Sequence, residues 1–547
     1  MTSERTPLIP KPSGVVEMSN RDFWLLLTGI WTTTFIGSVD GTIVATLLGP
    51  MASSFESMQL AQWIGSAYLL SVCCFTPLYG RLCNIIGRRT SSILASSIFA
   101  IGTTLCGVAQ TMNQLIFFRA LAGVGGGGMT VVGSVIMSDI VPLKSRGLYQ
   151  GFANLLFGLG GAIGAPLGGW LGDTIGWRAA FFLQGPVLAC GLVLMYLEIR
   201  EPEFIISAPK DGLWAKVKRV DFAGPFALAV SLGCFLVSLS YKTSAHLPWS
   251  NPQVYGYLAA SVSCMILFIA VEAYAVPEPV MPLSMLKMRT PGWVALNNFL
   301  VAVLSFSTIY TVPLYFTAFL LRSSSNAGAH LIPNSVAVAV GSLLAGWYMR
   351  KTGKYWWYQF FASSGLVIAN VGLVSWNHNT PEWIYYITLI PSGFAFASVL
   401  TTTLLALFAS VSRDNIPIAT GVSYLFRTAG QVLGVALSST LLQGLLASNL
   451  RARITGENAD ETIEKILDSV SVIRYLPPDI RAKATESWGI ALRGVFYAQL
   501  AVAVILFLSV IPIGEHPLPD RAEKSPVDEE ATPVGVATNN NTQAANA

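Results

Sequence analysis

Long apolar runs alternate with short polar stretches along almost the whole chain. A helix of about 20 residues, at ~1.5 Å of rise per residue, crosses the ~30 Å hydrocarbon core of a bilayer. The pattern therefore predicts an all-α polytopic membrane protein. Fourteen transmembrane helices are expected, at about residues 23–48, 62–80, 90–109, 114–138, 148–171, 179–199, 222–241, 254–276, 293–321, 329–349, 356–376, 383–411, 417–446 and 489–513.

The distribution of lysine and arginine predicts the orientation of these helices. With a cytosolic N-terminus, twenty-one basic residues fall in segments on the inside, whereas the short outside loops hold only Arg178, Lys242 and Arg322. Cytosolic loops carry such an excess of basic residues in membrane proteins. We therefore expect both termini in the cytosol, and one long, charged loop at 447–488 on the opposite, lumenal side.

The order of the predicted helices divides the chain into bundles and connections. Two six-helix bundles are expected, separated by a linker and two extra helices, which suits a transporter built from repeats. The predicted segments are a cytosolic tail at 1–22, a bundle at 23–200, a cytosolic linker at 201–221, two linker helices at 222–276, a second bundle at 277–513 and a disordered cytosolic tail at 514–547.

Composition agrees with a membrane protein and argues against several classes of function. The chain is 53% hydrophobic and only 11% charged, against about 25% charged residues in soluble domains. Its seven cysteines lie in or beside apolar runs and its four histidines are scattered, so no disulfide or metal site is predicted. No nucleotide-binding motif is present. We expect neither an enzyme nor a nucleic-acid-binding protein, and no cofactor other than a proton gradient.

Three ionisable residues lie deep inside predicted helices and are the candidates for proton and substrate coupling: Asp40, Arg119 and Arg427. An aspartate at a helix centre costs roughly 2.5–3.5 kcal/mol on insertion scales, so it faces protein or water and not lipid. From the rise per residue, Asp40 lies ~26 Å and Arg119 ~29 Å from the cytosolic side. The two side chains are therefore expected at similar depth, close enough to interact. They form either a proton-coupling pair or a static structural ion pair.

A glycine-rich basic turn follows the second predicted helix, in the sequence GRLCNIIGRR from Gly80 to Arg89. A similar sequence, GWYMRKTGKY, follows the tenth helix at Gly346 to Tyr355. Glycine and basic residues suit a tight cytosolic turn between packed helices. We predict a gating element in the first turn that consists of Gly80, Arg81, Asn84, Gly87, Arg88 and Arg89.

Small residues recur at nearly four-residue spacing in the fifth predicted helix, GLGGAIGAPLGGWLGD. This spacing lets two helix backbones approach closely, and proline permits a bend in a membrane helix. A packing and hinge element is therefore expected at Gly160, Gly164, Pro166, Gly168 and Gly169.

Five stretches resemble, in order and position, the signature motifs of the major facilitator superfamily. They are GSVDGTIVATLLGP, GRLCNIIGRR, the run from Arg119 to Gly128, GAPLGG and GWRAAFFLQGP. The chain looks like the fourteen-spanner drug:proton antiporter branch. PLYFTAFLLRSSSNAGAHLIP and IATGVSYLFRTAGQVLGV are similar to the fungal vacuolar basic amino acid transporters within it.

The resemblance implies a central cavity that Asp40 and Arg119 face. Two positions depart from the family pattern: Asn84 stands where the turn usually has an acid, and Ala165 splits the usual glycine-proline pair. The first departure weakens the charge relay of the turn. Four further side chains are expected in the cavity, where tyrosines add cation–π contact: Gln184, Tyr310, Tyr315 and Tyr424.

Together these features predict a proton-coupled antiporter that moves basic amino acids (lysine, arginine, histidine) from the cytosol into the vacuole. A cavity acid suits a cationic or zwitterionic cargo. Membrane lipid and protons are the other expected partners. Two alternatives stay open, a plasma-membrane exporter of drugs or organic cations and an amino-acid sensor without net transport.

The N-terminal tail predicts the destination of the protein. ERTPLI, with Glu4 ahead of Leu8 and Ile9, matches an acidic dileucine-type sorting signal that a cytosolic adaptor binds. A proline-bearing disordered tail without a sorting role is the alternative. The vacuolar membrane is the expected location, and the plasma membrane is the alternative location.

Overall fold

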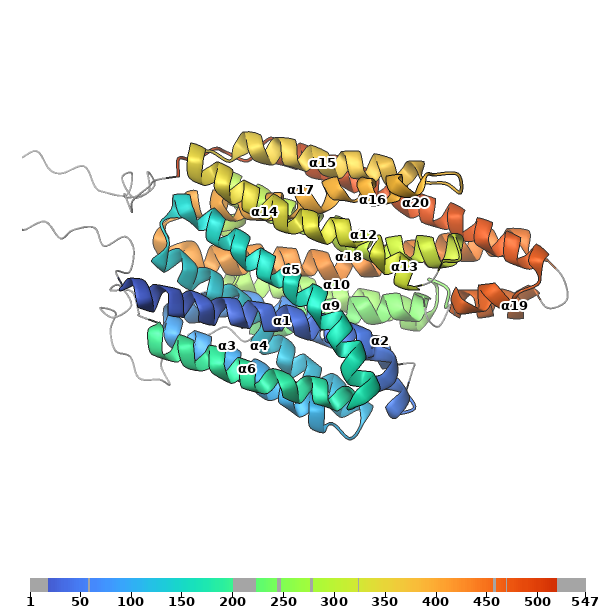
Figure 1. The fold of residues 1–547 in the computed structure, drawn as a ribbon, viewed down its shortest axis with the longest axis horizontal. Coiled ribbons are helices and arrows are strands. Elements are labelled where there is room, and N and C mark those ends of the chain that lie inside the picture. The colour runs from blue at the N-terminus through green and yellow to red at the C-terminus, as the bar shows by residue number, and fades with distance from the viewer. Residues whose placement is uncertain are drawn as a thin grey trace, which may run out of the picture.

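The structure is a computed structural model that describes residues 18–57, 60–199, 223–243, 247–275, 279–322, 324–455, 459–468 and 470–518. The regular elements it describes are all helical, and the long ones run side by side along one direction (Figure 1). We call the end of the bundle where the first helix begins, at Asn20, the tail side. The opposite end, where the helix Ala459–Asp468 lies, is the loop side (Figure 1).

Six helices form the first half of the molecule. α1 packs on α5 and α6, α4 packs on α2 and α3, and α3 packs on α6. Their bounds are α1 Asn20–Ser54, α2 Ala61–Ile85, α3 Arg88–Val108, α4 Met112–Ile140, α5 Leu143–Thr174 and α6 Trp177–Glu198.

The second half repeats this arrangement with six long helices. α12 packs on α18 and α20, α17 packs on α14 and α15, and α15 packs on α20, which are the same pairings in the same chain order. Its elements are α12 Arg289–Leu314, the π turn η3 Tyr315–Phe319, α13 Ser324–Ala329, α14 Ile332–Thr352, α15 Trp356–Ser375, α16 Glu382–Thr388, α17 Ile390–Ala409, η4 Arg413–Asn415, α18 Ile416–Arg453, α19 Ala459–Asp468, η5 Val470–Tyr475 and α20 Pro478–Val510.

A helical hairpin connects the halves in sequence and packs beside them. It consists of α9 (Ala223–Thr243), α10 (Pro252–Ala270) and the π turn η2 (Val271–Ala275), and the short α11 (Leu283–Lys287) follows. α9 contacts α2 of the first half and α18 of the second. Leu228 and Leu232 of α9 share one buried apolar cluster with Cys73, Cys74 and Leu425.

Twelve of the described helical segments are long and apolar enough to cross a membrane. α1 and α2, with 35 and 25 residues, are not among the twelve. Asp40 and three consecutive threonines lower the hydropathy of α1, and Gln62 and Arg81 do so in α2. The predicted fold class is confirmed, whereas the count of fourteen spanning helices is not confirmed exactly.

The long loop predicted at 447–488 is largely helical in the structure. α18 continues to Arg453 and α20 already begins at Pro478. Between them, Ile463, Ile466 and Ile473 are buried in the same apolar cluster as Trp488. The charged residues that suggest a loop lie on the exposed faces of helices, which the hydropathy of the chain does not separate from a true loop.

The two halves meet closely on the tail side. α2 packs on α18, and α5 packs on α14. A side chain at Gly80 would collide with the backbone at Pro417, and one at Gly346 would overlap the backbone at Gly147. Only glycine permits such an approach of two backbones. We call these two contacts the α2–α18 seam and the α5–α14 seam.

Candidate functional site

A cavity lies between the two halves. It encloses about 770 Å³ of empty space, including the solvent at its mouth. Side chains of α1, α2, α4, α5 and α18 line it, and most of its polar groups are neutral hydroxyls and amides. The lining consists of Ile30, Thr33, Thr34, Gly37, Tyr68, Gly126, Met129, Thr130, Gly133, Ser134, Met137, Gln150, Ala153, Asn154, Phe157, Tyr424 and Arg427.

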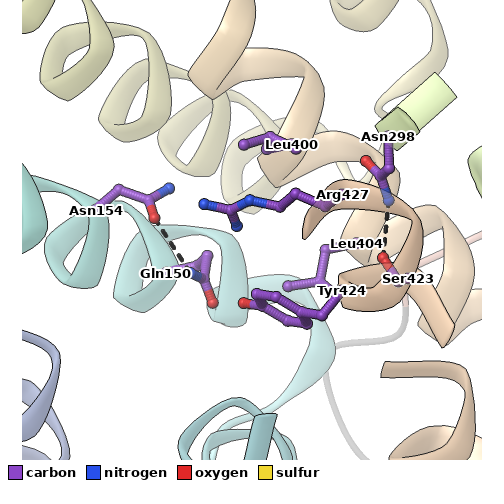
Figure 2. A pocket seen from close by; sticks show the side chains of 8 residues that line it. All are labelled: Gln150, Asn154, Asn298, Leu400, Leu404, Ser423, Tyr424 and Arg427. Atoms are coloured by element: carbon purple, nitrogen blue, oxygen red, sulfur yellow. Dashed lines mark hydrogen bonds between the residues drawn. The ribbon is translucent and has the colours of Figure 1, made fainter. Parts of the chain in front are cut away.

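A smaller pocket adjoins the cavity and shares four residues with it. Figure 2 shows the Arg427 side chain extending from α18 toward Gln150 and Asn154 of α5. The Gln150 amide donates to Asn154 Oδ1 at 3.4 Å. Asn298 of α12 donates to Ser423 Oγ at 2.7 Å on the other side of the pocket (Figure 2). Both halves of the molecule therefore contribute polar groups to the surroundings of Arg427.

Among the described residues, Arg427 is the one charged side chain in the lining of this cavity and of the adjoining pocket. Its guanidinium carbon lies 5.4 Å from the centre of the Tyr424 ring. Within the described part of the chain it forms no ion pair with a carboxylate. The lining of both spaces therefore carries a net positive charge.

Asp40 and Arg119 form a buried ion pair behind the cavity wall. Arg119 Nη1 donates to Asp40 Oδ2 at 2.8 Å, and the side chains are 1% and 0% exposed. Arg119 also lies over the ring of Tyr68, 4.4 Å from its centre. Tyr68 lines the cavity and the ion pair does not. The expected proximity of the two residues is therefore present, and the Tyr68 ring contacts both Arg119 and the cavity.

The other predicted cavity residues divide into two groups. Tyr424 lines the cavity. Tyr310, Tyr315 and Gln184 lie outside its lining. Tyr310 donates to Ser439 Oγ at 3.2 Å, Tyr315 packs in an aromatic cluster against Trp376, and the Gln184 amide bonds to the Ala180 carbonyl of its own helix. Residue type alone suggests a cavity position for these three side chains. The packing of their helices instead places them against other protein groups.

Sequence reasoning missed several polar residues of the site. Tyr68, Gln150, Asn154 and Asn298 are uncharged, so they do not stand out in an apolar run as Asp40, Arg119 and Arg427 do. A usable signal was present, because Gln150 and Asn154 are four residues apart and lie on one helix face. Amides inside an apolar run cost free energy unless they are hydrogen-bonded, so they indicate a polar cavity or interface.

The basic turn after α2 forms a hydrogen-bonded network on the tail side. Arg88 bonds to Asp139 at 3.0 Å and to Asn84 Oδ1 at 3.0 Å. Asn84 also donates to the Asp414 carbonyl of the second half at 3.0 Å, and Arg81 donates to the Pro279 carbonyl at 2.7 Å. An amide at position 84 both accepts and donates, so it joins Arg88 to the other half, which a carboxylate cannot do.

Two other members of this turn have local roles. Gly87 has φ of +91°, a conformation that a side chain disfavours and that turns the chain from α2 into α3. The Arg89 guanidinium lies 4.3 Å from the centre of the Tyr196 ring. The gating role predicted for the turn stays a prediction.

The glycines of α5 bring it into close contact with α1. Side chains at Gly160, Gly164 and Gly168 would meet atoms of Phe35, of Val39 and Thr42, and of Ile43, respectively. The face that also includes Gly169 therefore packs against a neighbouring helix. α5 continues through Pro166 as one helix. Packing is what these residues do in this conformation, and the hinge stays a prediction.

A further polar cluster lies on the loop side, around the buried His330. Its Nδ1 lies 2.7 Å from the Asn326 carbonyl, and its Nε2 lies 2.9 Å from Glu382 Oε1. Arg322 bonds to the same carboxylate oxygen, and this hydrogen bond raises the pKa of Arg322. The ring of His330 stacks on Phe316 at 3.9 Å between centroids. The cluster joins α13, the turn between α13 and α14 that holds His330, and α16. Among the described residues no group of three or more metal-ligating side chains comes together.

Comparisons with known proteins identify relatives along nearly the whole chain. The model of the Major Facilitator Superfamily matches residues 30–435. "Multidrug resistance protein fnx1" of Schizosaccharomyces pombe is 35% identical, over 93% of this chain and 95% of that protein. "Vacuolar basic amino acid transporter 2" of Saccharomyces cerevisiae is 30% identical, over 83% of this chain and 98% of that protein.

Solved structures share the fold at low sequence identity. A human organic anion transporter aligns with a TM-score of 0.59 and 14% identity, over 89% of this chain and 99% of that chain. A proton:xylose symporter aligns with a TM-score of 0.56 and 14% identity, over 93% of this chain and 98% of that chain. These two likenesses concern the arrangement of helices alone.

Proposed function

The chain belongs to the major facilitator superfamily of membrane transporters, and we propose that it is a proton-coupled antiporter of basic amino acids. In this proposal it moves lysine, arginine or histidine from the cytosol into the vacuole. The tail side faces the cytosol, and the loop side faces the lumen. Names of the relatives support amino acids and drugs about equally, so the argument for the cargo depends on the site.

The buried Asp40–Arg119 pair is the observation that carries the proton-coupling part of the proposal. An arginine at 2.8 Å favours the ionised carboxylate, whereas burial without that partner favours the protonated form. Movement of α1 against α4 within the first half that separates the pair would therefore load a proton on Asp40, and its re-formation would release the proton. Tyr68 contacts Arg119 and lines the cavity, so a ligand that displaces the Tyr68 ring would disturb the pair.

The driving force is large enough for accumulation. Exchange of one proton for one lysine or arginine cation moves no net charge, so the pH difference and not the membrane potential drives it. One pH unit supplies about 1.4 kcal/mol per proton, and each tenfold concentration ratio requires about 1.4 kcal/mol. A lumen that is one pH unit more acidic than the cytosol therefore supports about a tenfold accumulation of cargo. A variant with asparagine in place of Asp40 would lack this coupling. An Asp40–Arg119 pair that never separates would lack it as well.

Uptake of labelled lysine, arginine and histidine into isolated vacuoles tests the proposal. Vacuoles from cells with the chain are expected to accumulate basic amino acids when ATP energises their proton pump, and vacuoles from cells without it are not. A protonophore should remove the difference. Saturable binding without accumulation would instead indicate a sensor, and export of drugs at the cell surface would indicate the plasma-membrane alternative.

The vacuolar destination is proposed on the N-terminal tail, which lies outside the described residues. Replacing Leu8 and Ile9 together with alanine is expected to move a fluorescent fusion from the vacuolar rim to the plasma membrane, because the proposed adaptor contact is lost. Replacing Pro10 and Pro12 with alanine is the matched control, since it changes the same tail outside the motif. Unchanged rim fluorescence in the Leu8, Ile9 variant would contradict a sorting role for this motif.

A further inference from the structure

The charge of the cavity points to a specific part of the cargo. In the described part of the chain no carboxylate lines the cavity or the pocket beside it, and Arg427 is the one charged residue that does. An arginine keeps its charge at every physiological pH. A guanidinium without a counter-charge in a partly buried position is costly, and an anionic ligand that pairs with it offsets this cost.

The groups around Arg427 fit a carboxylate. A guanidinium presents a planar fork of donors that matches the two oxygens of a carboxylate. Figure 2 shows this fork directed from α18 toward the amides of Gln150 and Asn154 on α5, with Tyr424 beside it. A carboxylate at this point lies between the two halves of the molecule. Its binding therefore draws α5 and α18 toward one ligand.

The amino groups of the same ligand would meet a different part of the lining. Thr33, Thr34 and Thr130 provide hydroxyl oxygens, and Tyr68 and Tyr424 provide ring faces. Hydroxyl oxygens accept hydrogen bonds from ammonium groups, and ring faces attract them. These groups are neutral, so they tolerate a cation without compensating for the repulsion from Arg427. A cation that lacks a carboxylate gains the weaker contacts alone.

We propose that Arg427 binds the α-carboxylate of the cargo, so that the protein selects amino acids and rejects the amines formed by their decarboxylation. This inference rests on the proposed transport of amino acids and makes it more specific. It also separates amino acids from organic cations, which the names of the relatives do not.

Paired ligands test the inference on the purified full chain in liposomes with an imposed pH gradient. Uptake of labelled lysine is measured in the presence of arginine or agmatine, histidine or histamine, and unlabelled lysine or cadaverine. Each pair differs by the carboxylate. The amino acids are expected to compete with labelled lysine. Their decarboxylated partners should need an about 10- to 100-fold higher concentration for the same inhibition, which corresponds to the free energy of one charged hydrogen bond.

Variants of Arg427 then assign the effect to this residue. Arg427→Gln is expected to raise the KM for lysine by about 10- to 100-fold, and Arg427→Lys to recover part of it. Arg451→Gln is the matched control, because Arg451 is an exposed residue of the same helix, 24 positions along. Thermal unfolding with and without lysine shows whether Arg427→Gln is folded. A folded variant should lose the ligand-induced rise in Tm.

The possible failures are distinguishable. If lysine is carried and cadaverine competes equally well, or if Arg427→Gln has an unchanged KM, the inference is wrong and the proposed function stands. If the wild-type protein carries no basic amino acid, the proposed function is wrong. The inference is then judged by the Tm shifts that neutral amino acids and their amines cause. Equal shifts for both members of each pair would overturn it.

Discussion

Asp40→Asn is expected to lower the free energy of unfolding by about 3–5 kcal/mol, the typical cost of removing one partner of a buried ion pair. The change leaves the Arg119 guanidinium at 1% exposure without its counter-charge, and arginine does not lose its proton to relieve this. Arg119→Gln should cost less, because Asp40 becomes neutral when it takes up a proton. Thermal unfolding of the purified full chain measures this asymmetry.

The double variant Asp40→Asn, Arg119→Gln separates a coupling pair from a static one. It removes both charges, so most of the stability should return, as it does when a buried ion pair is replaced as a unit. Proton-driven lysine uptake should nevertheless stay absent, whereas exchange of lysine down its own gradient should persist. A stable double variant that still accumulates lysine with the proton gradient would show that the pair is structural.

Gly346→Val is expected to open the α5–α14 seam. A side chain at this position overlaps the backbone at Gly147, and such overpacking typically costs about 1–3 kcal/mol. That cost lowers the population of molecules closed on the tail side, relative to those open there, by about 5- to 150-fold. The uptake rate should fall accordingly, since each cycle requires the closed form.

Native cysteines at the α2–α18 seam report whether opening of the α5–α14 seam separates the two halves as a whole. Cys73 and Cys74 are buried in the wild-type structure in the cluster between α2, α9 and α18. Their labelling by a water-soluble maleimide should become faster in Gly346→Val, and a Cys73→Ala, Cys74→Ala background shows which signal is theirs. Gly444→Val is the control, because a side chain at Gly444 meets nothing within 4 Å. Equal labelling in both glycine variants would contradict a joint opening of the two seams.

Much of the fold follows from the sequence because the bilayer leaves few alternatives. Backbone groups must be paired within the hydrocarbon, so an apolar run of sufficient length is a helix. Helix bounds were less predictable: α20 begins eleven residues before the expected start at 489, since its first turns are amphipathic. The pairing of Asp40 with Arg119 was predictable for a similar reason, because two opposite charges at equal depth in an apolar medium attract strongly.

The cavity itself could not be obtained from the sequence in the same way. Which side of a helix faces the cavity depends on packing between helices far apart in the chain. Tyr315 and Tyr424 look equivalent in the sequence, yet one packs against Trp376 and the other lines the cavity. His330 and Glu382 are 52 positions apart, and only the fold brings them together.

The α9–α10 hairpin covers only one of the two seams, so the other seam faces lipid. α9 covers the α2–α18 seam, whereas the α5–α14 seam has no such cover among the described helices. Ile332, Val336, Val340 and Leu344 form an exposed apolar stripe along α14 at four-residue spacing, which acyl chains would contact. The α5–α14 seam, whose backbones meet at Gly147 and Gly346, would therefore open against lipid, whereas the α2–α18 seam would open against protein.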